Sequence, residues 1–338
     1  MNSNTNCACG NPSHYYTAEK SDKKFALTDY SPKDKPWNSH RSDVDEISAI
    51  YATASEFERL AVRTSQCSGR LDFKWAVEQE TGEARLKLFR AEFCRVRYCP
   101  VCQWRRTLMW QARFYEALPA VVSQFPLAKW AFLTLTVPNC EISDLRETLS
   151  VMNKAWNKFV QRKEFKPVQG WIRTTEVTRG KDGSAHPHFH VLLMIPPSML
   201  SGVNYVKRDV WLQNWRDCMG NQSITQVDIR TVKPKKSGAV LEAVSPLDML
   251  KGAVAETLKY STKADDLKTD GGWFLELTRQ THKLRFIASG GALKNILKPE
   301  EETNADLVGA DGEALEETSG EISFQWQKAK KAYHRRLD

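Results

Sequence analysis

Three histidines at alternating positions form a candidate set of imidazole ligands. They are His186, His188 and His190, in a chain of 338 residues that has seven histidines in all. Residues i, i+2 and i+4 of a β-strand project from the same face of a sheet. Imidazoles aligned on one face are costly to bury without partners. The pattern therefore favours a metal or catalytic site, and a solvent-exposed histidine stripe is the alternative interpretation.

A carboxylate on the preceding segment can complete this set. Residues 171–179, WIRTTEVTR, are followed by the turn residues GKDGS and then by HPHFHVLLMI, which predicts a β-hairpin. If the turn is centred on Asp182, Glu176 lies opposite His188, with a Cβ separation of about 5 Å. Glu176, His188 and His190 would then hold one divalent cation and leave coordination positions for water and phosphate oxygens. This inference depends on the hairpin register, because a slip of one residue turns Glu176 to the other face.

A second candidate group lies in residues 253–263, AVAETLKYSTK. Helical spacing places Glu256, Tyr260 and Lys263 on one face. A tyrosine can act as a covalent nucleophile, a neighbouring carboxylate as a base, and a lysine as a stabiliser of phosphate charge. Taken alone, the triplet is more typical of a solvated helix face.

Four of the eight cysteines have a spacing that is typical of structural zinc sites. They are Cys67, Cys94, Cys99 and Cys102. In a chain without secretory features, clustered cysteines indicate a metal site before disulfides. The arginines around the cluster suit contacts with DNA phosphates, and they are Arg95, Arg97, Arg105 and Arg106. Buried thiols beside a solvated basic helix are the alternative.

Composition is that of a soluble globular protein, with 41% hydrophobic and 27% charged residues. The formal net charge of +8 is compatible with a polyanionic partner. The sequence has no apolar run near the roughly 20 residues of a membrane span and no secretory signal. We therefore expect a cytoplasmic protein that does not contact membranes.

The order of predicted elements indicates an α+β fold with a central antiparallel sheet. We expect helices at 44–62, 103–118 (ending at Pro119), 144–163, 204–219 and 248–263. We expect hairpins at 71–94 and 171–195, strands at 130–139 and 224–232, and a last strand or loop at 283–290. We divide the chain into a disordered arm (1–42), a Cys-rich helical and hairpin module (43–125), a catalytic domain (126–298) and a charged flexible tail (299–338).

Several of these motifs, taken in order, resemble those of a known family. FLTLTVPN at 132–139, TTEVT at 174–178, HPHFHVLLM at 186–194 and AETLKYSTK at 255–263 resemble the motifs of plasmid rolling-circle replication initiators. These proteins form the single-tyrosine class of the HUH endonuclease superfamily. CRVRYCPVCQWRR at 94–106 is similar to the cysteine cluster found upstream in many members. The resemblance spans roughly residues 67–290.

The resemblance implies a role for each matching residue. His188 and His190 match the two metal ligands, and Glu176 resembles the carboxylate that members often place on the adjacent strand. Tyr260 matches the nucleophile, and Glu256 matches the glutamate that activates water at termination. The implied fold is a ferredoxin-like antiparallel sheet flanked by helices, with the histidines on a central strand and the tyrosine on a neighbouring helix.

The family's reaction is the metal-dependent nicking and rejoining of one DNA strand at a plasmid origin. The resemblance implies Mg²⁺ or Mn²⁺ at the histidines, a structural Zn²⁺ at the cysteines, and a hairpin or single-stranded nick site as substrate. Host helicase and DNA polymerase are the implied partners, and a homodimer is one implied state. A histidine-triad nucleotide hydrolase and a zinc-stabilised DNA-binding regulator that does not nick DNA are the competing interpretations. A mobilisation relaxase shares the metal motif but usually places its tyrosine before the histidines.

Overall fold

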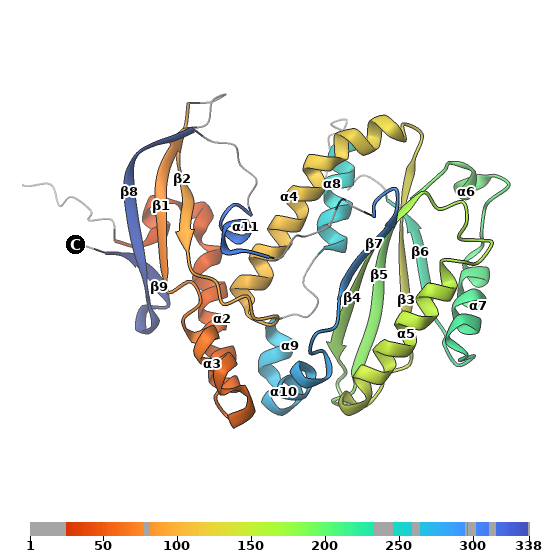
Figure 1. Cartoon of the computed structure of the whole chain (residues 1–338), viewed down its shortest axis with the longest axis horizontal. Helices are drawn as coiled ribbons and strands as arrows, with labels where there is room; N and C mark the ends of the chain where they lie inside the picture. The colour runs from red at the N-terminus through yellow and green to blue at the C-terminus, as the bar shows by residue number, and fades with distance from the viewer. Residues whose placement is uncertain are drawn as a thin grey trace, which may run out of the picture.

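The computed structural model describes residues 25–77, 82–232, 246–258, 264–294, 296, 302–310 and 316–336. Two antiparallel sheets lie in separate halves of the molecule, and helices fill the space between them (Figure 1). The fold is therefore α+β with antiparallel sheets, as predicted. In the part of the chain that the structure describes, no helix combines the length and apolar character needed to cross a membrane.

The larger sheet has ferredoxin-like topology. Its strands, in spatial order, are β6 (Val227–Thr231), β3 (Lys129–Thr136), β5 (Ala185–Ile195), β4 (Gly170–Arg179) and β7 (Ile287–Gly291), and every neighbouring pair is antiparallel. Helix α5 (Leu145–Phe159) connects β3 to β4, and α7 (Arg208–Met219) connects β5 to β6. Strands β3 to β6 thus form a βαββαβ unit with the histidine strand β5 in its interior, and β7 is added at the edge beside β4.

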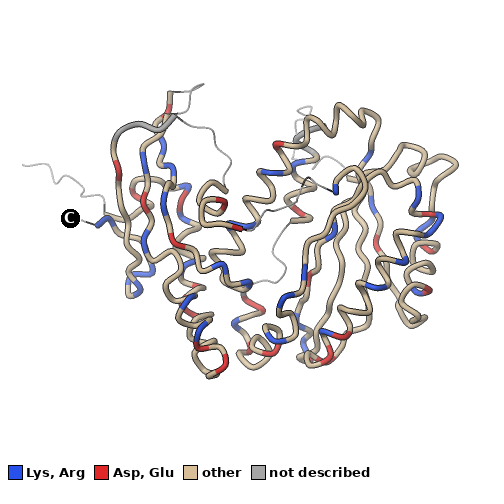
Figure 2. The backbone as a smooth tube through the Cα atoms, in the orientation of Figure 1, with Lys and Arg blue, Asp and Glu red and all other residues tan. Residues whose placement is uncertain are grey.

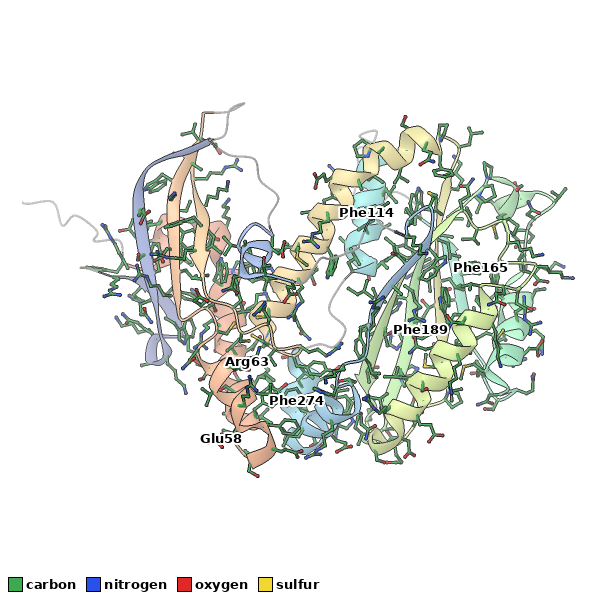
Figure 3. The ribbon with its side chains drawn as sticks, viewed as in Figure 1. Glu58, Arg63, Phe114, Phe165, Phe189 and Phe274 are labelled. Carbon is green, nitrogen blue, oxygen red and sulfur yellow. The ribbon has the colours of Figure 1, made fainter. Side chains whose placement is uncertain are left out.

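The two faces of this sheet contact different helices. Phe189 of β5 points towards α5 and α7, where its ring centroid lies 6.2 Å from those of Trp156 and Trp215. On the opposite face, Leu192 packs in a separate apolar cluster with Phe114 of α4 (Pro100–Gln124) and residues of α8 (Pro246–Thr257). Figure 3 shows Phe189 and Phe114 in these separate layers. Because side chains alternate along a strand, His188 and His190 project towards the side of α4 and α8.

The prediction of a flexible tail at 299–338 is wrong for its described part, because two strands of the smaller sheet lie there. Its strand order is β2 (Ala84–Ala91), β1 (Arg70–Val77), β8 (Glu316–Gln327) and β9 (Ala332–Arg335). The predicted hairpin of β1 and β2 is confirmed, and β8 pairs with β1 on its other side. The alternating residues Ile322, Phe324 and Trp326 are all buried. The described part of the tail therefore forms half of a sheet, because its apolar alternation outweighs the acidic residues before it.

The N-terminal prediction also needs correction. Residues 1–24 of the predicted arm lie outside the described residues, but α1 (Leu27–Tyr30) and α2 (Pro36–Tyr51) begin within it. Leu27 and Trp37 are buried in the main core. The helix predicted at 44–62 is in fact two helices, α2 and α3 (Glu58–Ser65). Ala54 between them has extended backbone, and the Thr53 hydroxyl donates to the Ile50 carbonyl at the end of α2. Local side-chain hydrogen bonds of this kind compete with helix continuation.

Two further helix ends differ from the prediction. Helix α4 continues through Pro119 to Gln124, because Leu118 and Val121 pack on the apolar cluster against the sheet. Helix α8 ends at Thr257, and residues 259–263 lie outside the described part of the chain. The remaining short elements are α6 (Ser198–Ser201), α9 (Ala264–Thr269), α10 (Gly271–Gln280), α11 (Asn304–Val308) and 3-10 turns at Pro32–Asp34, Ser55–Phe57, Ile142–Asp144 and Lys328–Lys330.

Candidate active site and metal centre

The hairpin of β4 and β5 has the predicted register. Glu176 pairs with His188 across the two strands, and Thr174 pairs with His190. The turn is held by the Asp182 carboxylate, which accepts from the backbone N–H and the hydroxyl of Ser184. Cross-strand partners share a face of the sheet. The turn therefore places one carboxylate and two imidazoles on the same face.

Glu176, His188 and His190 form a compact cluster. The Oε2 atom of Glu176 lies 3.0 Å from Nε2 of His188 and 2.7 Å from Nε2 of His190. One ligand atom from each residue lies within 4.8 Å of the others. The His188 side chain is 11% exposed and that of His190 37%. The cluster is thus enclosed beside His188 and open beside His190, where a substrate would reach it.

The hydrogen bonds around the cluster suit a bound cation. Nδ1 of His188 lies 3.2 Å from the His186 carbonyl oxygen. A hydrogen bond from Nδ1 to this oxygen would orient the ring and leave Nε2, which faces Glu176, available to a metal ion. Burial raises the pKa of Glu176, but hydrogen bonds and charge from His188 and His190 outweigh burial and lower it to about 2. An ionised carboxylate with two imidazole nitrogens is a donor set that fits a divalent cation.

The end of α8 lies on the same face as this cluster. The Thr174 hydroxyl donates to the carbonyl oxygen of Thr257, at 3.0 Å. Because Thr174 is paired with His190, the last residue of α8 lies beside the histidine strand. Glu256 is exposed on this helix. Tyr260 and Lys263 lie outside the described residues, so their shared face with Glu256 stays a prediction.

The four predicted cysteines converge in the other half of the molecule. Sγ of Cys67 lies 3.5 Å from those of Cys99 and Cys102, and the sulfurs of Cys94 and Cys102 are 3.6 Å apart. Zn–S bonds of about 2.3 Å in a regular tetrahedron place neighbouring sulfurs about 3.8 Å apart. All four residues are buried, and no two are joined by a disulfide. The sulfur spacing therefore matches a tetrahedral metal site.

The surroundings of the sulfurs also suit a cation. Backbone N–H groups of Cys94, Arg95 and Val96 donate to sulfur atoms of the cluster. Burial raises the pKa of Cys99, which makes its thiolate costly to form without a positive partner. A divalent cation with a preference for thiolates supplies that partner, and Zn²⁺ is the common one.

We expect Cys102→Ser to lose the metal of this cluster. Serine is a poor zinc ligand, and structural zinc contributes directly to folding. Purified wild-type protein should contain about one zinc per chain by elemental analysis, and the variant close to none, with a lower Tm. The matched control is Cys140→Ser, because Cys140 is half-buried and lies outside the cluster. Full zinc content in Cys102→Ser would remove Cys102 from the ligand set.

The four predicted phosphate-binding arginines do not form one surface. Arg105 is 1% exposed, and its guanidinium donates to the carbonyl oxygens of Leu307 and Val308. It stabilises the contact of α4 with α11, so the prediction that it binds DNA is wrong. A helix pattern cannot reveal this, because the partner carbonyls lie about 200 residues later in the chain. The other three arginines, Arg95, Arg97 and Arg106, are at least partly exposed.

Residues just before β7 lie beside these arginines and are not predicted as site residues from the sequence. Arg97 donates to the Leu284 carbonyl oxygen, and its guanidinium carbon lies 4.5 Å from the centroid of the Phe286 ring. Arg285, between these two residues, is exposed beside them. The basic pair in KLRF is the available signal, but the sequence pattern predicts only a strand or loop there. Figure 2 shows Lys and Arg both on the connection from β2 to α4 and on the chain leading into β7.

Comparison with known proteins gives one family for most of the chain. A family model described as "Replication protein" matches residues 85–334. "Protein rep" of Streptococcus pneumoniae serotype 2 is 29% identical over 93% of this chain and 96% of its own length. "Protein rep" of Bacillus amyloliquefaciens is 34% identical over 80% of this chain and 81% of its own. A "Replication protein" of Staphylococcus aureus is 31% identical over 64% of this chain and 95% of its own. No solved structure matches the chain significantly.

Proposed function

The chain belongs to the replication protein family, whose members initiate rolling-circle replication of plasmids, and we propose that it does so by nicking one strand of the plasmid origin. One observation carries the proposed chemistry. Glu176, His188 and His190 converge on the face of the sheet against which the end of α8 lies. The proposed nucleophile, Tyr260, follows the last residue of α8 by only three positions.

Glu176, His188 and His190 are the residues that would hold a catalytic Mg²⁺ or Mn²⁺. Such an ion, when bound, would polarise a phosphate oxygen and offset the charge that develops in the transition state. The partly exposed His190 marks the side on which a phosphate can approach. The buried His188, fixed by the His186 carbonyl, keeps the donor set in place.

Tyr260 is the proposed nucleophile. Its phenolic oxygen attacks the scissile phosphorus in line with the departing 3′ oxygen of the preceding nucleotide. One P–O bond forms and one breaks, so the products are a 5′-phosphotyrosine and a DNA end with a free 3′-OH. The phenol gives up its proton and the departing oxygen takes one up. Lys263, proposed to lie on the same side, stabilises the phosphate charge.

The substrate is a single-stranded or extruded segment of the origin. An attack in line with the backbone requires access around the phosphate, and stacked duplex DNA restricts it. A hairpin at the origin would present the strand in this form. The free 3′-OH is a primer terminus, so the host DNA polymerase and a helicase that separates the strands are the partners the reaction requires.

Glu256 is the proposed base for the terminating cleavage, at which water replaces tyrosine as the nucleophile. We expect Glu256→Ala to form the first covalent product at the wild-type rate but to accumulate it, because release slows by about 10²-fold or more. Gel analysis of released strands over time measures this step. Glu116→Ala, at an exposed position on α4, is the control. Wild-type release from the Glu256 variant would exclude this role.

The proposal is tested with overlapping single-stranded oligonucleotides that tile the plasmid origin. Each is incubated with the protein and Mn²⁺, carrying a label at its 3′ or its 5′ end. A 3′ label should move with the protein on a denaturing gel, and a 5′ label should appear on a shorter free strand. Binding without a covalent band would instead indicate a regulator that does not nick DNA. Hydrolysis of dinucleotides without a covalent band would indicate a histidine-triad hydrolase.

A further inference from the structure

A cavity lies where the Cys-rich segment meets the edge of the larger sheet. Its volume is about 380 Å³, within the usual range of small-ligand sites. The lining side chains that matter here come from the segment before α4, from α4, from β4 and from the chain before β7. They are Arg95, Arg97, Arg106, Trp110, Thr174 and Arg285.

The cavity is strongly basic. Glu302 is the carboxylate among its lining residues, and it accepts two hydrogen bonds from Arg106, at 2.6 and 2.9 Å. Arg95 and Arg97 donate to backbone carbonyl oxygens, which carry no net charge. Arg285 is exposed. Three of the four guanidinium groups are therefore not balanced by a carboxylate of the lining, so an anion in the cavity would be attracted to them.

The cavity adjoins the Glu176–His188–His190 cluster. Thr174 lines the cavity and is the cross-strand partner of His190. Leu258, which follows the last residue of α8, lines it as well. A strand with one phosphate at the histidines can therefore pass directly into the cavity with the next nucleotide.

We propose that this cavity binds a nucleotide of the origin strand next to the scissile phosphate, an inference that rests on the proposed nicking function. Guanidinium groups bind phosphate oxygens through paired hydrogen bonds. Arg97 and Arg285 supply these groups from two separate segments. Trp110, half-buried at the wall, offers an aromatic surface to the base. A nucleotide is the ligand that uses both the charge and the ring.

This assignment also gives the cysteine cluster a role in DNA binding. The Arg95 N–H donates to the sulfur of Cys102, and the Val96 N–H donates to that of Cys94. Arg95 has a left-handed backbone, with φ of 55°. A metal held by the sulfurs would fix the short segment that presents Arg95 and Arg97. The cluster is thus a positioning element for the nucleotide cavity.

The test uses Arg285→Gln, because Arg285 is exposed and its loss leaves the core intact. Fluorescence anisotropy measures the Kd of a labelled single-stranded origin oligonucleotide without added Mg²⁺ or Mn²⁺. We expect Kd to rise by about tenfold at low salt, and the slope of log K against log salt to become shallower by about 0.7, the value for one phosphate contact on a single strand. Arg59→Gln is the matched control, because Arg59 is exposed on α3 and does not line the cavity.

A second measurement locates the nucleotide. Oligonucleotides are shortened one nucleotide at a time from each end. At one step of this series the affinity of wild type should fall while the affinity of Arg285→Gln stays the same. Equal affinities for wild type and Arg285→Gln, or an equal loss in Arg59→Gln, would overturn the cavity assignment. The covalent band formed by wild type with Mn²⁺ separates the two proposals. If wild type forms the covalent band and Arg285→Gln binds DNA normally, only the cavity assignment is refuted. If Arg285→Gln loses binding and wild type forms no band, only the nicking function is refuted.

Discussion

Tyr260→Phe should eliminate the covalent protein–DNA band and lower strand cleavage by about 10³-fold or more, the scale on which loss of a covalent nucleophile acts. The substitution removes only the phenolic oxygen, which is the atom proposed to bond to phosphorus. The ring remains, so binding of the origin oligonucleotide should change little. Cleavage is measured with the 3′-labelled oligonucleotide and Mn²⁺, and binding by fluorescence anisotropy.

The control for this prediction is Tyr205→Phe, since Tyr205 is exposed between α6 and α7, away from the histidine cluster in sequence and fold. It should form the covalent band at the wild-type level. A full-strength band in Tyr260→Phe would mean that another side chain attacks the phosphate. The metal site would then stand, but the assignment of Tyr260 as the nucleophile would not.

The convergence of the candidate metal ligands on the larger sheet could be predicted because it depends on a local sequence pattern. Alternation with a period of two fixes which side chains share a face, and a short turn fixes the register. Both lie within one hairpin of 26 residues, from Gly170 to Ile195. Glu176, His188 and His190 therefore came together as predicted. The four cysteines did so as well, because metal-ligand spacing is a constraint of its own.

Long-range pairing could not be read in the same way. Strand β1 at 70–77 pairs with β8 at 316–327. Neither segment has a sequence feature that predicts this pairing. The same holds for Arg105, whose carbonyl partners belong to Leu307 and Val308. Charge and polarity predict whether a residue prefers water, but a buried arginine with hydrogen-bond partners from a distant segment looks identical in sequence to an exposed one.

The fold connects the two candidate metal sites through the chain between them. Helix α4 begins at the cysteine cluster and ends against the face of the sheet that carries the histidines. The cysteine half is closed by the returning strands β8 and β9, while the histidine half contains the ferredoxin-like unit. Under the proposed function, a DNA strand bound at the arginines near the cysteines would lie close to the histidines.

His188→Ala should lower cleavage by more than about 100-fold while origin binding survives. Loss of an outer partner of a metal ligand already costs roughly 10–100-fold in affinity or activity, so loss of a ligand costs more. The Kd should stay within about twofold, because the arginines rather than the metal ion supply most of the attraction for phosphates. Cleavage is measured over a series of Mn²⁺ concentrations, and binding without the ion.

The same measurements on His282→Ala, an exposed histidine before β7, should match wild type. High Mn²⁺ should restore part of the activity of His188→Ala, because Glu176 and His190 keep two of the three donors. An equal loss of binding and cleavage in His188→Ala would mean that the histidine serves the fold or the DNA contact. In that case a metal ion held by His188 would no longer be needed to explain the loss of cleavage.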